Sequence, residues 1–200
     1  FEDKYIWVLA DHGRAVVVDP GDATPVLDYL DRTGAELEVV LVTHHHRDHT
    51  GGLATLARAT GCRVLGPASI AGVSEAVREG RIKLPGTGLA GEVFPTPGHT
   101  LDHLAYYLAG HLFCGDTLFG AGCGRLFEGT PAMMVESFAR LTALPDDTRV
   151  CPAHEYTLAN LAYARSVAPA DAELAARALA DTAARAAGQP TLPTTLAREK

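Results

Sequence analysis

Apolar and polar positions in the first part of the chain predict short strands alternating with helices. Residues 5–10 and 15–19 are two runs rich in β-branched and aromatic side chains, joined by a polar turn, and they predict a β-hairpin. Residues 24–32 carry apolar side chains at helical spacing and predict a helix. Residues 37–43 form a nearly continuous apolar run, which is typical of a strand that is covered on both faces.

The rest of the chain continues this mixture. It predicts helices at residues 53–60 and 131–144 and strands at residues 63–65, 92–96, 104–108, 111–114 and 149–151. Residues 86–91 read Gly-x-Gly-x-x-Gly, but a strand and not a helix follows, so they predict a β-turn and no dinucleotide site. From Tyr156 onward the chain is alanine-rich and predicts two helical segments separated by Pro169.

The order of these elements predicts an α/β fold in which two sheets carry helices on their outer faces. Hairpins occur at the start and again in the middle of the chain, which disfavours a single parallel sheet. We expect residues 1–155 to form this main domain and residues 156–200 to form a C-terminal helical region packed onto it. A pair of helices buried in the core is the alternative for that region.

Charge and hydrophobicity narrow the range of partners. The 200 residues have a formal net charge of −7, so we do not expect the basic surface that nucleic-acid binding needs. No apolar run approaches the ~20 residues of a membrane-spanning helix, so we expect no membrane partner. A monomer that binds a small molecule is the expectation.

Cysteine usage indicates a reducing environment. The four cysteines are Cys62, Cys114, Cys123 and Cys151. None of them forms a Cys-x-x-Cys pair, and a chain of this size does not need disulfides, so we expect reduced thiols and a cytoplasmic setting. The chain begins at Phe1 and not at a methionine, which leaves room for a removed leader.

A histidine-rich loop follows the apolar strand at residues 37–43. Residues 43–49 read Thr-His-His-His-Arg-Asp-His, and the pattern His-x-His-x-Asp-His contains His44, His46, Asp48 and His49. Imidazole and carboxylate groups are ligands of zinc, iron and manganese, so the loop predicts a metal site. An exposed polar loop or a purification tag is the alternative, but a tag is uniform and terminal, whereas this run is mixed and internal.

Three further side chains lie where predicted strands end, beside a glycine or a proline. They are His99 in Pro-Gly-His-Thr, Asp116 in Cys-Gly-Asp-Thr and His154 in Pro-Ala-His-Glu. A single histidine at a strand end is more often structural, but the loop offers too many ligands for one ion with a bound water. Seven ligands fit two ions about 3.5 Å apart that share a hydroxide and one carboxylate. Asp116 can bridge because a carboxylate has two oxygens.

Together these motifs resemble the metallo-β-lactamase superfamily and, within it, the bacterial type of the glyoxalase II (hydroxyacylglutathione hydrolase) family. The resemblance covers essentially the whole chain, including residues 1–9 and the Val-Asp-Pro-Gly-Asp run at residues 18–22. It implies a four-layer αββα sandwich with a C-terminal helical appendage and with two metal ions at one edge. Zinc is the expected metal, with iron or manganese possible.

The resemblance also implies how the ligands are shared. His44, His46 and His99 would hold one ion, Asp48, His49 and His154 the other, and Asp116 would bridge them. His45, at an x position of the pattern, is expected to be exposed. His103 is expected to be a hydrogen-bond partner of the ligands.

Glutathione contacts are implied for three more residues, namely Arg125, Phe127 and Tyr156. The alternatives to a glutathione contact are a solvated arginine for the first residue, a core phenylalanine for the second and a tyrosine at the start of a helix for the third. Two departures from the family stand out. Lys4 replaces the usual asparagine, with a small expected effect, and the family continues beyond the position of Lys200 through a segment that helps close the glutathione site.

The implied activity is hydrolysis of S-D-lactoylglutathione, with Asp48 orienting a metal-bound hydroxide and Asp116 holding both ions. A persulfide dioxygenase with a single iron and a non-catalytic metal-binding module are the alternatives. No Gly-x-Ser-x-Gly motif occurs, which disfavours a serine hydrolase.

Overall fold

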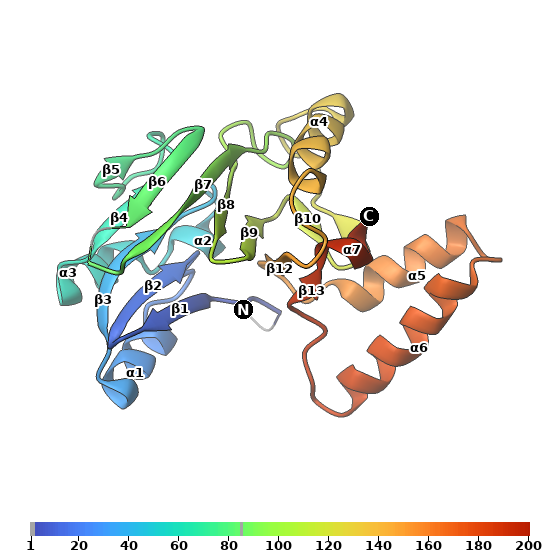
Figure 1. Cartoon of the computed structure of the whole chain (residues 1–200), viewed down its shortest axis with the longest axis horizontal. Helices are drawn as coiled ribbons and strands as arrows, with labels where there is room; N and C mark the ends of the chain where they lie inside the picture. The colour runs from blue at the N-terminus through green and yellow to red at the C-terminus, as the bar shows by residue number, and fades with distance from the viewer. Residues whose placement is uncertain (1–2, 85) are drawn as a thin grey trace.

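The computed structural model describes residues 3–84 and 86–200. Phe1, Glu2 and Pro85 lie outside the described residues, so the first two positions of the segment 1–9 that carries part of the family resemblance are not described. Within the described residues there are two large sheets and a two-stranded one, β10 (Leu118–Phe119) with β11 (Gly122–Cys123) (Figure 1). No helix within the described ranges has the length and apolarity that crossing a bilayer requires.

The first sheet begins with the predicted hairpin and continues with parallel strands. Its five strands, in order, are β1 (Trp7–Asp11), β2 (Arg14–Val18), β3 (Glu36–Leu41), β4 (Arg63–Gly66) and β5 (Glu75–Ala76). The strands from β2 to β5 are parallel, and each connection between β2, β3 and β4 contains a helix. These helices are α1 (Thr24–Thr33), the short α2 (Arg47–Thr50) and α3 (Leu53–Thr60).

The second sheet is mixed and has six strands. In order they are β13 (Thr194–Thr195), β12 (Arg149–Pro152), β9 (His111–Gly115), β8 (Leu104–Leu108), β7 (Leu89–Pro95) and β6 (Gly80–Leu84). Strands β6 and β7 pair antiparallel from Leu84 opposite Leu89. The glycine string therefore forms the turn of a hairpin and leads into a strand, which confirms the prediction of a turn.

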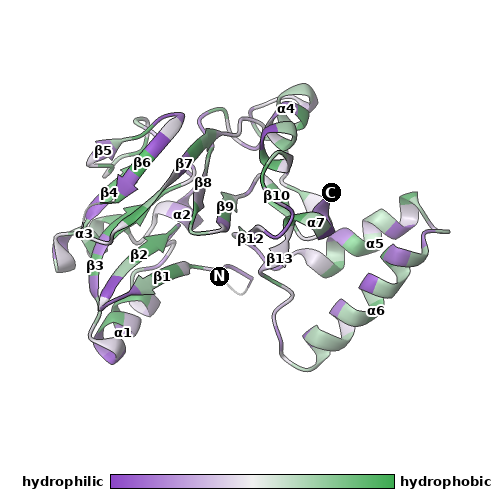
Figure 2. Ribbon diagram, in the orientation of Figure 1, coloured by the Kyte–Doolittle hydropathy of each residue, from purple (hydrophilic) through white to green (hydrophobic). Residues whose placement is uncertain are grey.

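Alternating side chains of the strands create the layers. In β2, Val16 and Val18 pack against residues of the second sheet, whereas Ala15 and Val17 pack against α1 and α3. Successive residues of a strand point to opposite faces, so a strand covered on both sides must be apolar throughout. Figure 2 shows this hydrophobic character along the central strands.

The outer face of the second sheet is covered in the same way. Leu112, Cys114 and Val150 of this face pack against Leu141 of α4 (Pro131–Thr142) and Leu196 of α7 (Leu196–Glu199). Helices therefore cover the outer faces of both sheets. This arrangement confirms the αββα sandwich.

Two more helices, α5 (Thr157–Val167) and α6 (Ala172–Ala186), form the C-terminal appendage. They lie beside each other and project from the sandwich (Figure 1). Tyr163 and Leu179, one on each helix, are more than 70% exposed, so these helices are not a buried core pair. A buried leucine, Leu161, anchors α5 to the body.

Candidate metal centre

Four loops at one edge of the sandwich carry the predicted site residues. The loop between β3 and the end of α2 carries four of them, and the other three follow β7, β9 and β12. The structure brings all seven side chains into one cluster: His44, His46, Asp48, His49, His99, Asp116 and His154. Residues separated by as many as 110 positions in the sequence therefore meet here because the strand ends share one edge.

Glycines allow the histidine loop to cross the loop after β2. A Cβ atom at Gly21 would overlap the carbonyl group of Asp48, and a Cβ at Gly52 would lie 2.6 Å from the carbonyl oxygen of Pro20. Real side chains do not approach backbone atoms so closely, so only glycine fits at these crossings. The close packing holds the residue 19–22 loop directly against the ligand-bearing loop.

The first group of ligands consists of His44, His46 and His99. The Nε2 atoms of His44 and His99 each lie 3.0 Å from Nδ1 of His46, so three ring nitrogens converge. Burial lowers the pKa of all three imidazoles. They are therefore neutral at pH 7, and neutral imidazole is the form that binds a metal ion.

The second group consists of Asp48, His49 and His154. Asp48 Oδ2 lies 3.2 Å from His49 Nε2 and 3.1 Å from His154 Nε2. Burial acts to lower the pKa of His49, but three neighbouring carboxylates outweigh it and raise that pKa to about 10. The same neighbourhood holds the pKa of Asp48 far below its usual value, although burial acts to raise it. Negative charge therefore concentrates in this group.

Asp116 lies between the two groups. Its Oδ2 atom is 3.4 Å from His99 Nε2, and its Oδ1 atom is 3.4 Å from His49 Nε2 and 3.7 Å from His154 Nε2. Oδ1 is buried and has no hydrogen-bond partner among the described residues. An unpaired buried carboxylate oxygen is costly unless a cation compensates it. The residues present therefore fit a pair of metal ions with Asp116 between them.

Neighbouring residues orient the ligand rings through the nitrogen that faces away from the cluster. The contacts are His44 Nδ1 to Thr43 Oγ1 (3.0 Å), His49 Nδ1 to Asp19 Oδ2 (2.8 Å), His99 Nδ1 to the Arg125 carbonyl oxygen (2.7 Å) and His154 Nδ1 to Asp3 Oδ1 (3.3 Å). Such partners fix the ring orientation and leave Nε2 facing the cluster.

Asp19 is a functional residue that the sequence patterns miss. It is buried, and its two oxygens also accept hydrogen bonds from the backbone N–H and the hydroxyl of Thr43, each at 2.8 Å. In the sequence it is the end of the second predicted strand and part of the residue 18–22 run that carries the family resemblance, but no role follows for it from either. Its contact with His49 spans 30 positions and comes from the loop crossing, so the lone signal is an acidic residue at a strand end.

Lys4 is closer to the cluster than the sequence suggests. Its side chain is 3% exposed, and its Nζ atom lies 2.7 Å from His49 Nε2. Burial lowers the pKa of Lys4, while three nearby carboxylates act to raise it. The small effect expected of this replacement stays a prediction, and the structure places the side chain beside His49 and Asp48.

The two other histidines of these loops behave as expected. His103 is buried, stacks on His44 with ring centres 4.8 Å apart, and accepts a hydrogen bond from the backbone N–H of Asp116 at 3.2 Å. It therefore supports the ligands. His45 turns away from the cluster toward the carboxylates of Asp102 and Glu128, at 3.3 and 3.4 Å, and its side chain is 40% exposed.

The three residues expected to contact glutathione lie at the rim of the cluster. Phe127 is 59% exposed, with its ring centre 5.5 Å from that of His46, so the alternative of a core phenylalanine is wrong. The guanidinium carbon of Arg125 lies 5.2 Å from the centre of the Phe127 ring. Tyr156 stacks on His154 with ring centres 4.8 Å apart.

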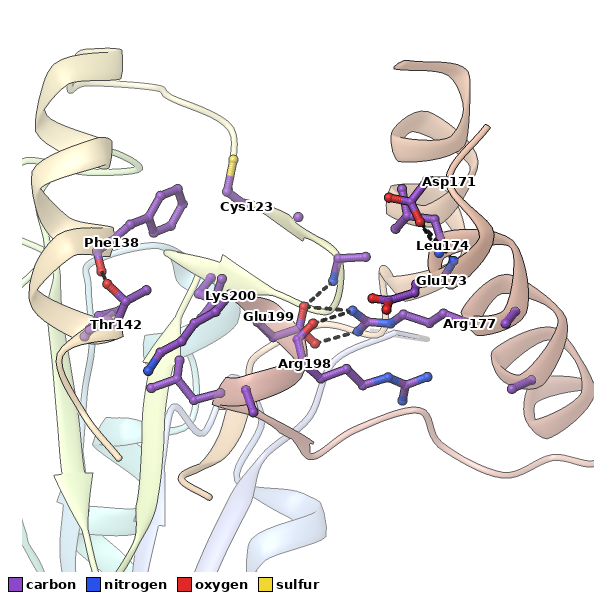
Figure 3. Close-up of a pocket in the computed structure, with 18 residues that line it drawn as sticks. Cys123, Phe138, Thr142, Asp171, Glu173, Leu174, Arg177, Arg198, Glu199 and Lys200 are labelled. Atoms are coloured by element: carbon purple, nitrogen blue, oxygen red, sulfur yellow. Dashed lines mark hydrogen bonds and ion pairs between the residues drawn. The ribbon is translucent and has the colours of Figure 1, made fainter. Parts of the chain in front are cut away.

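A large groove lies elsewhere, between α4, α6 and α7. It measures about 1110 Å³ and is lined by Phe138, Leu174 and Lys200, among others. Figure 3 shows residues that line it, among them the paired Arg177 and Glu199, which are joined by dashed lines. None of the seven clustered ligands lines this groove, so it is separate from the metal centre.

Comparison with known proteins assigns both parts of the chain. Residues 2–154 match the family model of the metallo-beta-lactamase superfamily, and residues 155–200 match that of the hydroxyacylglutathione hydrolase C-terminus. The hydroxyacylglutathione hydrolase of Thiobacillus denitrificans is 54% identical over 203 residues, which cover 100% of this chain and 79% of the relative. That of Methylobacillus flagellatus is 52% identical, with coverage of 100% and 81%.

Solved structures share the sandwich. The BLEG-1 B3 metallo-beta-lactamase has a TM-score of 0.70 at 25% identity, over 76% of this chain and 86% of that structure. ETHE1 from Myxococcus xanthus has a TM-score of 0.68 at 31% identity, over 76% of this chain and 71% of that structure. On the matches along its whole length, the chain belongs to the metallo-beta-lactamase superfamily and, within it, to the hydroxyacylglutathione hydrolase family.

Proposed function

We propose that the protein hydrolyses the thioester S-D-lactoylglutathione to D-lactate and glutathione with the help of two divalent metal ions. The position of Asp116 carries this proposal, because its two oxygens face different ligand groups. Metal-dependent hydrolysis is also the activity of the family to which the chain belongs. The C-terminal match to the hydroxyacylglutathione hydrolase family supports the choice of a glutathione thioester.

The proposed ligand set divides as the two groups do. His44, His46 and His99 would hold one ion, Asp48, His49 and His154 the other, and Asp116 would bridge them; the short distances within each group support this division. When bound, the ions supply a hydroxide nucleophile at neutral pH, because coordination lowers the pKa of water to ~7. Imidazole and carboxylate donors suit zinc, which we propose as the metal, and also iron and manganese.

Asp48 is proposed to orient the attacking oxygen. Its side chain is 25% exposed, more than that of Asp116, so it can reach a molecule that enters from solvent. Its low pKa keeps it a hydrogen-bond acceptor at neutral pH. The leaving group needs little help, since a thiol with a pKa near ~8.5 departs readily as the thiolate.

Arg125, Phe127 and Tyr156 are proposed to hold the glutathione part of the substrate. Glutathione carries carboxylates, which pair well with a guanidinium group such as that of Arg125. The exposed ring of Phe127 and the partly exposed ring of Tyr156 offer apolar surface on either side of the ligand cluster. Both rings also contact ligand histidines, so bound substrate would lie next to the reacting centre.

The alternatives fit the geometry less well. A persulfide dioxygenase with a single iron would not need a second group of ligands, and a non-catalytic metal module would not need rim residues that contact both groups. Oxygen uptake with glutathione persulfide would support the dioxygenase. Tight metal binding without turnover would support the metal module.

The proposal is tested by following the loss of thioester absorbance with purified, metal-analysed protein. We expect rapid hydrolysis of S-D-lactoylglutathione and much slower hydrolysis of thioesters that lack glutathione. Equal rates with both substrates would contradict the assignment of glutathione contacts. A cytoplasmic setting is part of the proposal and is supported by the free state of all four cysteines.

A further inference from the structure

The loop that carries two of the proposed glutathione contacts runs alongside the loop of the ligand His99. The backbone N–H of Phe127 donates to the His99 carbonyl oxygen at 3.2 Å, and that of Gly129 donates to the Gly98 carbonyl oxygen at 3.0 Å. A Cβ atom at Gly129 would lie 2.7 Å from the Cα atom of Gly98, so the two backbones are in close contact.

Glu128 adds a side-chain anchor to these backbone contacts. Its Oε2 atom accepts a hydrogen bond from the backbone N–H of Leu101 at 2.8 Å, and its Oε1 atom lies 3.4 Å from Nε2 of His45. His45 is the residue between the ligands His44 and His46. One carboxylate therefore joins the glutathione loop to both loops that supply the first ligand group.

The two side chains that this loop presents have little else to fix them. Arg125 and Phe127 are both exposed, and the guanidinium carbon of Arg125 lies 5.2 Å from the centre of the Phe127 ring. The edge-on contact of that ring with His99, at 5.2 Å between ring centres, is on the side of the metal centre. Because exposed side chains keep much of their freedom, their placement depends on the backbone that carries them. A backbone that is fixed in advance lowers the entropy that binding costs.

We propose that Glu128 is a positioning residue for substrate binding, which holds this loop so that Arg125 and Phe127 already lie beside the metal centre when the glutathione part of the substrate arrives. The inference rests on the proposed function, because it assumes the glutathione contacts. Glu128 is not one of the seven clustered ligands. Its loss should therefore weaken substrate binding and leave the chemical step unchanged.

Replacement of Glu128 by methionine tests the inference. Glu128→Met keeps about the length of the side chain but cannot accept the hydrogen bond from Leu101, so the KM for S-D-lactoylglutathione should rise at least about fivefold. The kcat and the metal content should stay unchanged. Calorimetry should show a matching loss of affinity for S-methylglutathione, a thioether that is not hydrolysed. The kcat/KM for the lactoyl thioester of N-acetylcysteamine should not change, since that substrate lacks the glutathione part.

Two further variants of Glu128 separate positioning from a general loss of structure. Glu128→Gln keeps an oxygen that accepts the Leu101 hydrogen bond, so it should restore a KM close to that of the unmodified protein. Glu128→Ala also lacks the acceptor and should behave as Glu128→Met does. Glu36→Met is the matched control, because it removes the same charge at an exposed position, at the end of β3 that lies away from the histidine loop. Thermal melting reports whether each variant folds.

A folded Glu128→Met or Glu128→Ala with unchanged KM and unchanged affinity for S-methylglutathione would overturn the inference. An equal loss of kcat/KM with both thioesters would overturn it as well, because the effect would then lie at the metal centre. The unmodified protein separates the inference from the proposed function. If it neither hydrolyses S-D-lactoylglutathione nor binds S-methylglutathione, the proposed function is wrong. If it does both, and Glu128→Met does both equally well, only the role of Glu128 is wrong.

Discussion

At the scale of single residues, Asp116 is the residue that links the two groups of ligands into one centre. Among the described residues, its carboxylate is the one group whose two oxygens face different ligand groups, and one of those oxygens is buried without a hydrogen bond. Its backbone N–H is held by His103, so the carboxylate is positioned independently of any ion. Removing one of its oxygens tests the bridge without removing the side chain.

We predict that Asp116→Asn lowers thioester hydrolysis by more than about 100-fold, because even partners behind the ligands account for 10- to 100-fold effects. The amide presents one oxygen and one N–H, so metal content should fall below two ions per chain. The rate of hydrolysis and the metal content are measured on the same purified sample. Asp11→Asn, at an exposed position of β1, is the control, and full activity with full metal content in Asp116→Asn would contradict the bridge.

A second prediction concerns Asp19, which does not reach the cluster itself. Asp19→Asn should weaken metal binding by about 10- to 100-fold, because the ring of His49 loses the charged partner that orients it. The affinity for Zn²⁺ is measured by competition with a chelator. An unchanged affinity would show that the loop crossing at Gly21 and Gly52 orients His49 without help from Asp19.

The ligands were predictable from the sequence, whereas their supporting residues were not. His44, His46, Asp48 and His49 form a local pattern, and residues of that chemistry at one strand end have few structural explanations. Asp19 and Lys4 show no such pattern, because each acts through a contact with His49 that spans 30 or 45 positions. Only the packing of the loops places them.

At the scale of secondary-structure elements, Glu155 connects two distant segments of the chain by hydrogen bonds. Its carboxylate accepts hydrogen bonds from the Tyr5 hydroxyl, the Thr191 hydroxyl and the Thr191 backbone N–H, the last at 2.9 Å. It thus joins the N-terminal segment that carries Lys4 to the segment after α6. Burial acts to raise the pKa of Glu155, but these hydrogen bonds outweigh it and hold the pKa below the usual value.

A group whose pKa is lowered by folding stabilises the protein above its unfolded pKa, and the stabilisation is lost as the pH falls. We therefore predict that Glu155→Gln lowers the free energy of unfolding at pH 7 by about 1 to 2 kcal/mol. The difference should shrink as the pH falls below about 4.3, where the carboxylate of the unfolded chain takes up a proton before that of the folded chain does. Urea unfolding at pH 7 and at pH 3.5 measures the loss of stability and its dependence on pH.

Glu136→Gln, at an exposed position of α4, is the control and should change the free energy of unfolding by less than about 0.5 kcal/mol. A loss in Glu155→Gln that is the same at both pH values would contradict the role given to the carboxylate charge.

The elements themselves were predicted unevenly. The first hairpin, the strand before the histidine loop and the α4 helix are long or strongly patterned, and all three are confirmed. The β5 and β6 strands were missed because residues 66–91 are rich in turns and lie at the edges of the sheets. The alternation of Ile82 and Leu84 with charged residues was the available signal for β6.

At the scale of the whole molecule, the sandwich and the appendage are joined by a cluster of charges. Arg177 of α6 pairs with Glu199 of α7 at 2.5 Å and with Asp181 at 3.4 Å. Glu199 also accepts a hydrogen bond at 2.7 Å from the backbone N–H of Ala121, four residues before Arg125. The cluster therefore links the helical appendage to the loop that carries the proposed glutathione contacts.

Loss of this link should affect substrate binding more than metal binding. Glu199→Gln leaves the guanidinium of Arg177 without its main partner in a position where its side chain is 10% exposed. We predict a loss of about 3 kcal/mol in the free energy of unfolding and a higher KM for the glutathione thioester, with metal content unchanged. Glu173→Gln, at an exposed position of the helix that carries Arg177, is the control. Unchanged KM and stability in Glu199→Gln would contradict the link.

The four-layer arrangement was predictable because β2 and β3 are apolar on both faces, which only a covered sheet allows. The position of the appendage was not, since the alanine-rich sequence of α5 and α6 suits either a buried or a projecting pair. The charge cluster that holds it joins residues from three separate elements. Such a cluster has no signature in the sequence.

The need for two metal ions is tested by measuring hydrolysis of S-D-lactoylglutathione by the metal-stripped protein as Zn²⁺ is returned. We predict negligible turnover without metal and full turnover when the number of bound ions reaches two per chain. Full turnover of the stripped protein, or no turnover with two ions bound, would contradict it.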